Sequence, residues 1–141
     1  MLTKSILSQK EVAHMLSAAK AEAQRNGWAV TISIVDDGGH PLALERLDGC
    51  APIGAYIAMD KARSAALGRR ESADYENMIN NGRTAFLSAP NLAGMLEGGV
   101  PVVLNGQVIG AIGVSGVKAD QDAQVAKAGA AAIATLTEAS A

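Results

Sequence analysis

Apolar residues recur at helical spacing near both ends of the chain. Val12, Met15, Leu16, Ala19 and Ala23 form one apolar stripe that predicts a helix. Ser8 and Glu11 have the spacing of a capping box at its start, and Gly27 stands where a left-handed cap would end it. A second, alanine-rich helix is predicted over residues 125–136, opened by Asp120 and Asp122.

A strict alternation of apolar and polar positions follows the first helix. Trp28, Val30, Ile32 and Ile34 share one face, which predicts a half-buried strand. The Asp-Gly-Gly sequence at 37–39 breaks the pattern, and residues 40–47 resume it with Leu42 and Leu44 on one face. Pro41 has no amide to donate, so this second strand begins there or lies at a sheet edge. The two strands are predicted to form a β-hairpin.

A second hairpin is predicted over residues 99–116. Asn105-Gly106 lies between two apolar runs and is the favoured two-residue hairpin turn. On its second strand, Val108, Ile112 and Val114 are predicted to share one face. The other face, predicted to carry Ile109, Ala111, Gly113 and Ser115, is nearly flat, and therefore lets a helix or a ligand approach closely.

The segments between and around the hairpins complete the predicted order of elements. A helix is expected from Pro52 to near Gly68, and a helical turn or two over residues 71–79. Residues 89–99 are expected to be loop with a short helical piece. The order helix, hairpin, helix, irregular segment, hairpin, helix predicts an α/β sandwich on an antiparallel sheet, in one domain over residues 1–141.

Composition excludes several function classes. The net charge of −2 and an aromatic content of 3% give no basis for binding nucleic acid. The longest apolar run, AGAAAIATL from Ala128, is much shorter than the ~20 residues of a membrane span. Cys50 is the only cysteine, which excludes an internal disulfide and a cysteine-based zinc site. The N-terminus does not resemble a signal peptide, so a cytoplasmic location is expected.

The densest candidate chemistry lies in the stretch IVDDGGHPLALERLDG, residues 34–49. His40 follows two glycines at a strand start, where its ring is presented rather than packed. It is either a loop-tip histidine bonded to Asp36 or Asp37, or an imidazole that such a carboxylate orients as a metal ligand or proton carrier.

Further charged residues allow two interpretations each. Arg46 and Asp48 either pair at the rim of the sheet, or Arg46 joins Lys61 and Arg63 in a site for carboxylates. Glu97, before Gly98 and Gly99, is either an ordinary loop acid or a general base beside exposed backbone amides.

The motifs VDDGGHPLALERLDG, DKARSAA, EGGVPVVLNGQVIGAIGVSG and DQDAQVAKAG resemble the GlcG/HbpS-like haem-binding family, whose module is also the C-terminal domain of PduO-type proteins. The resemblance covers residues 8–136. It implies a profilin-like α+β fold, with an antiparallel sheet of about five strands, helices on both faces, and assembly into tetramers to octamers. The positions that match the family are Asp36, Gly38, Gly39, His40, Arg46, Asp48, Lys61, Glu97, Gly98, Gly99, Gly113, Ser115 and Gly116.

The resemblance and the residues support two functions. The first is binding of haem or a related tetrapyrrole, with His40 as axial ligand of the iron. The second is a cofactor-independent tautomerase, hydrolase or deaminase that acts on a small unsaturated or oxo-carboxylate in aromatic or glycolate-type catabolism. In this enzyme His40 or Glu97 moves the proton, and Arg46 or Lys61 holds the carboxylate. A structural oligomer without chemistry is a third interpretation.

The expected partners are a small anionic ligand and further copies of the chain. The expected ligand-binding residues are Asp36, Gly39, His40, Arg46, Asp48, Gly98, Gly99 and Ser115. An anionic ligand needs a cation, amide donors and a titratable group close together. We therefore expect His40, Arg46, Glu97, Gly98 and Ser115 to converge on one concave site, within one chain or with a neighbouring subunit.

Overall fold

One antiparallel sheet of four strands, in the order β2-β1-β4-β3, organises the chain. The computed structural model describes residues 1–140. The strands are β1 (Thr31–Asp36), β2 (Pro41–Arg46), β3 (Gly99–Leu104) and β4 (Gln107–Ser115). Both predicted hairpins are confirmed, and β2 is an edge strand that begins at Pro41. The expected number of about five strands is wrong, because residues 71–98 form helical turns and loop instead of a further strand.

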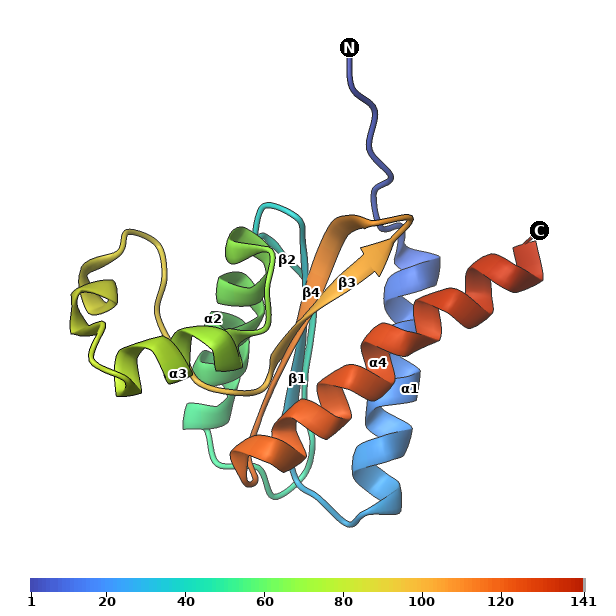
Figure 1. The fold of residues 1–141 in the computed structure, drawn as a ribbon. Coiled ribbons are helices and arrows are strands. Elements are labelled where there is room, and N and C mark those ends of the chain that lie inside the picture. Colours follow the sequence, from blue (N-terminus) through green and yellow to red (C-terminus); the bar gives the residue numbers. More distant parts are fainter. Residues whose placement is uncertain (141) are drawn as a thin grey trace.

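Helices cover both faces of this sheet, as expected (Figure 1). On one face lie α1 (Gln9–Arg25) and α4 (Ala119–Ser140), and on the other α2 (Ile53–Gly68) and the shorter α3 (Ser72–Asn80). A 3₁₀-helix, η1 (Thr84–Ser88), follows α3, and residues 89–98 are loop without the expected helical piece. No helix among residues 1–140 is both long enough and apolar enough to cross a membrane.

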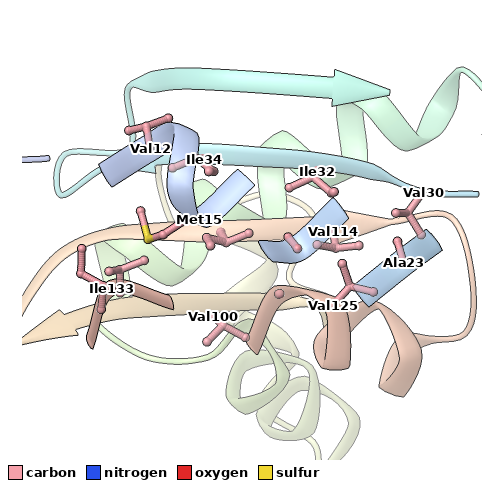
Figure 2. Close-up of a cluster of buried hydrophobic side chains, with 14 of the residues drawn as sticks. Val12, Met15, Ala23, Val30, Ile32, Ile34, Val100, Val114, Val125 and Ile133 are labelled. Atoms are coloured by element: carbon pink, nitrogen blue, oxygen red, sulfur yellow. The ribbon is translucent and has the colours of Figure 1, made fainter. Parts of the chain in front are cut away.

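The larger core lies between the sheet and the helix pair α1 and α4. Figure 2 shows side chains from both helices and from the strands meeting there, among them Met15, Ile32, Val114 and Val125. The predicted stripe of α1 supplies Val12, Met15, Ala19 and Ala23 to this core. Since each fully buried side chain of this size contributes about 1.5–3 kcal/mol, this layer holds the sheet in place.

The opposite face of β1 is buried as well, so the prediction of a half-buried strand is wrong. Thr31 and Ser33 have no exposed surface, because α2 lies over them. Their hydroxyls find partners there: Ser33 Oγ donates to Met59 Sδ at 3.0 Å, and Thr31 Oγ1 lies 3.3 Å from Cys50 Sγ. Two polar residues in a central strand are thus tolerated because each hydroxyl has a partner.

Ile109 does not share the flat face of β4 as predicted. Val102 pairs with Gly110 and Val103 with Val108, which leaves Ile109 as the extra residue of a bulge. The bulge turns its side chain into the core beside α1 and α4. The remaining flat face is covered by α2, since a Cβ on Gly113 would lie 2.1 Å from the Ala58 carbonyl oxygen. Within one chain, therefore, a helix and not a ligand occupies this face.

Candidate functional site

The turn between β1 and β2 is built around the carboxylate of Asp36. Asp36 Oδ1 accepts hydrogen bonds from the backbone amides of Gly38 and His40, both at 2.9 Å. The same oxygen lies 3.0 Å from His40 Nδ1. The expected bond between His40 and a nearby carboxylate is therefore confirmed for Asp36. Gly39, at φ +80°, supplies the left-handed conformation that closes the turn.

The contact with Asp36 orients the His40 imidazole. An ionised carboxylate accepts hydrogen bonds, so Nδ1 is the ring nitrogen that carries a proton toward Asp36. In the neutral tautomer this leaves the lone pair on Nε2, and the His40 side chain is 77% exposed. Metal-binding histidines commonly have this arrangement, in which a carboxylate orients one nitrogen and the other is free to bind.

Asp36 is held as a carboxylate by the turn that it organises. Its partial burial by itself would raise the pKa of Asp36. The amide hydrogen bonds from His40 and Gly38, with the His40 imidazole nearby, lower this pKa below its ordinary value of 3.8 instead. The carboxylate that orients His40 is therefore ionised throughout the neutral range.

Replacing Asp36 with asparagine is expected to destabilise the protein at pH 7 by about 1 kcal/mol, a figure kept small because the side chain is 34% exposed. Since folding lowers the pKa of Asp36, its stabilising effect is present above the pKa of the unfolded chain. That effect disappears as the pH falls through the folded-state value. Urea unfolding of both proteins should thus differ at pH 7, and the difference should shrink as the pH falls below about 4, the ordinary pKa of an aspartate. Asp48→Asn is the control, because it removes an exposed acid that has no side-chain hydrogen-bond partner among residues 1–136.

An apolar groove between β2 and α2 leads to this turn. It encloses about 360 Å³ and is lined by Leu44, Ala55, Tyr56, Met59, Asp60 and Arg63. A Cβ on Gly39 would lie 2.9 Å from Arg63 Cγ, so Arg63 contacts both the groove and the turn that carries His40. Tyr56 is 72% exposed and presents its ring at the groove. The sequence signal for Tyr56 at this groove is a single aromatic residue on a helix rich in small residues.

Lys61 connects three elements of the fold through buried hydrogen bonds. Its ammonium group donates to the Val114 carbonyl at 2.9 Å and to Asp122 Oδ2 at 3.0 Å. The two side chains are only 4% and 3% exposed. Lys61 therefore ties α2 to β4 and to the start of α4, and its ammonium group is not presented to a ligand at the surface of one chain.

Asp122, the partner of Lys61, was predicted only as an acid that opens the last helix. Burial raises the pKa of Asp122, while the charge and hydrogen bond of Lys61 and the Val117 amide act against that shift. No local pattern indicates this pair, since 61 residues separate its members.

The amides around Glu97 are not exposed as predicted. The Glu97 amide faces Glu76 Oε1 at 3.5 Å, and the Gly99 amide donates to Ser72 Oγ at 2.8 Å. Gly98 and Gly99 are buried, and the Gly98 carbonyl accepts the Val114 amide. Ser115 is also buried, at the end of β4. These residues anchor the start of β3 rather than line an open anion site.

The five residues expected at one site do not converge within one chain. Val35 pairs with Pro41, next to His40, whereas Gly98 bonds Val114, which is level with Ile32. His40 and Gly98 are three residues apart along the strands and three strand spacings apart across the sheet. This places them roughly 17 Å from each other. Convergence between neighbouring subunits stays a prediction.

Arg46 and Asp48 line a different pocket, at the opposite end of β2 from His40. The expected grouping of Arg46 with Lys61 and Arg63 does not occur, because Lys61 is buried and Arg63 lies 3.7 Å from Asp60 in the α2 groove. Within residues 1–136, no three His, Cys, Asp or Glu side chains gather as a metal cluster would require.

Comparisons with known proteins agree on one family. The family model described as "Haem degrading protein HbpS-like" matches residues 7–131. Protein GlcG of Escherichia coli (strain K12) is 62% identical over 115 residues, which cover 82% of this chain and 85% of that protein.

Two solved structures have a similar fold. A double mutant of HbpS from Streptomyces reticuli is 29% identical and aligns with a TM-score of 0.83 over 93% of this chain and 89% of that chain. The structure of a PduOC:haem complex is 24% identical, with a TM-score of 0.81 over 91% and 95% of the two chains.

Proposed function

Because the chain belongs to the haem-degrading protein HbpS-like family, we propose that it binds haem or a related tetrapyrrole, with His40 as the axial ligand of the iron. The observation that carries this proposal is the Asp36–His40 pair. Asp36 holds Nδ1 at 3.0 Å, and the largely exposed ring leaves Nε2 free to bind a metal.

The surroundings of His40 suit a flat apolar ligand with acidic groups. Leu44, Tyr56 and Met59 offer an apolar wall next to the turn, and Arg63 offers a guanidinium for a carboxylate. When bound, haem would supply an iron centre able to bind and reduce small molecules, and the residues of this chain would hold and orient it. The solved PduOC:haem complex supports the proposal, since a protein of this fold holds that group.

Exposure of His40 also supports a role for a second copy of the chain. A ligand seated on an exposed imidazole and an open groove leaves one of its faces uncovered in a single chain. We propose that neighbouring subunits cover that face in a homo-oligomer, which the family resemblance implies to be a tetramer to octamer.

The residues assigned to the alternative enzyme do not gather beside His40 within one chain. Lys61 is bonded to Asp122 and Val114, and Arg46 lines the pocket at the opposite end of β2. Glu97 precedes Gly98, which lies roughly 17 Å from His40. Haem binding therefore has more support than the alternative enzyme.

Titration of the purified protein with haemin tests the proposal directly. We expect a sharpened Soret band that saturates at a fixed haem-to-chain ratio. His40→Ala should abolish or shift this band, and Asp36→Asn should weaken haem binding about 10–100-fold because it releases the ring from its orienting carboxylate.

His14→Ala is the matched control for this titration. His14 is the only other histidine, and its Nε2 is buried in the structure rather than presented at the surface. The control should keep the wild-type band. An unchanged band in His40→Ala would assign the iron to another ligand, with His14, Tyr56 and Tyr75 the next candidates. Absence of any band in the wild-type protein would overturn haem binding itself.

A further inference from the structure

A polar pocket lies at the end of β2 away from His40. It encloses about 430 Å³ and is lined by Lys20, Gln24, Gly27, Trp28, Ala29, Glu45, Arg46, Leu47 and Asp48. The end of α1 forms one wall: Gly27, at φ +70°, turns the chain, and the Trp28 amide donates back to the Ala23 carbonyl. The end of β2 forms the other, where the Leu47 amide donates to the Val30 carbonyl at 2.9 Å.

The charges in this pocket are only partly balanced by each other. Lys20 Nζ and Glu45 Oε1 form an ion pair at 2.7 Å. Among residues 1–136, whose side chains the structure describes, Arg46 and Asp48 have no ion-pair or side-chain hydrogen-bond partner. Arg46 is the last residue of β2 and Asp48 lies in the turn that follows it, and both line this pocket. One free guanidinium and one free carboxylate thus line the same pocket.

We propose that this pocket binds a small zwitterion of the α-amino acid class with an apolar side chain. The ligand carboxylate would take the two-pronged grip of Arg46, and its ammonium group would face Asp48. Trp28, Ala29 and Leu47 provide apolar surface for the side chain. A ligand with only a carboxylate would bring a second negative charge near Asp48. A ligand with only an amine would bring a second positive charge near Arg46. This site is independent of the haem proposal, because neither His40 nor the α2 groove contributes to it.

Trp28 makes the proposal directly measurable, since it is the only tryptophan in the chain. Haem-free protein is titrated with three probes that share an isobutyl side chain: L-leucine, 4-methylpentanoate without the amine, and 3-methylbutylamine without the carboxylate. We expect a saturable change in Trp28 fluorescence with leucine, and affinities at least about tenfold lower for the other two probes. Calorimetry on the same samples should give one site per chain.

Four variants define which residues bind the probe. Arg46→Gln and Asp48→Asn should each weaken leucine binding about tenfold or more, since each removes a charged hydrogen-bond partner. Arg25→Gln is the matched control: Arg25 lies near the same end of α1 but pairs with Glu22 outside the pocket, and its loss should leave the titration unchanged. His40→Ala should also bind leucine normally, even if haem binding fails.

Three outcomes would overturn the proposal. No saturable signal with leucine by either method removes the site. Equal binding of 4-methylpentanoate reduces it to a general carboxylate site. If Arg46→Gln or Asp48→Asn lowers the mass of the ligand-free protein in light scattering, the two charges pair between copies of the chain and the surface is an interface instead.

Discussion

Replacement of Lys61 by methionine is expected to lower the free energy of unfolding by about 3–5 kcal/mol. The substitution keeps much of the side-chain volume but removes the charge that faces Asp122 at 3.0 Å. Asp122, which is 3% exposed, would then remain as a buried carboxylate with only the Val117 amide as a described partner. Loss of one member of a buried pair costs more than the pair itself contributes, because the other charge stays desolvated.

The double variant Lys61→Met with Asp122→Leu separates this cause from a packing defect. It removes both charges and should recover much of the lost stability, which gives a large coupling energy in the double-mutant cycle. Lys127→Met is the control, because its pair with Glu71 at 3.6 Å involves side chains that are 58% and 41% exposed and is worth less than about 1 kcal/mol. Urea unfolding of five proteins provides the measurement: the wild type, Lys61→Met, Asp122→Leu, the double variant and the control.

The pH dependence of Lys61→Met gives an independent check. Burial already raises the pKa of Asp122 in the folded protein, and loss of Lys61 removes an interaction that lowers it. A carboxyl with a raised folded-state pKa destabilises the fold increasingly as the pH rises from its unfolded to its folded value. The variant should therefore recover stability as the pH is lowered from 7 toward 5. Equal losses in the single and double variants, with no such recovery, would contradict the assigned role of the pair.

The elements of this fold that the sequence predicts are those specified by neighbouring residues. Asn105-Gly106 adopts the left-handed conformations of a hairpin turn, with φ values of +51° and +76°, as that dipeptide favours. The bond between Asp36 and His40 is predictable for the same reason, since both residues belong to one turn. Local pattern and local structure agree at these positions.

The features that the sequence does not predict depend on residues far apart in the chain. The alternating pattern predicts that Thr31 and Ser33 face solvent. In the structure α2 covers both residues, and Met59 of α2 accepts the hydrogen bond of Ser33. The pattern places Ile109 on the flat face of β4, but the register between β3 and β4 creates a bulge at this residue. The sequence makes Lys61 a candidate surface cation, but in the structure it is buried and paired with Asp122 of α4. Each case requires knowledge of which element packs on which, which periodicity alone does not contain.

Gly113→Ala is expected to lower the free energy of unfolding by about 3 kcal/mol or more, or to prevent folding. A Cβ at this position would lie 2.1 Å from the Ala58 carbonyl oxygen and 2.4 Å from the Ala62 nitrogen. Both are backbone atoms inside α2, so no side chain can turn aside to make room. The helix would have to move away from the sheet and open the layer in which Ala62, Ala65 and Ala66 pack against Val35 and Ala111.

Gly38→Ala is the matched control for the added methyl group. Its nearest neighbour is the exposed ring of His40, at 2.8 Å from the new Cβ, and this ring can rotate away into solvent. Because turning the ring gives up its contact with Asp36, we expect a loss of no more than about 1 kcal/mol, measured by urea unfolding beside Gly113→Ala. The comparison also tests how the flat face of β4 is used. If Gly113→Ala is as stable as the wild-type protein, α2 does not pack directly on Gly113, and that face is open to a ligand after all.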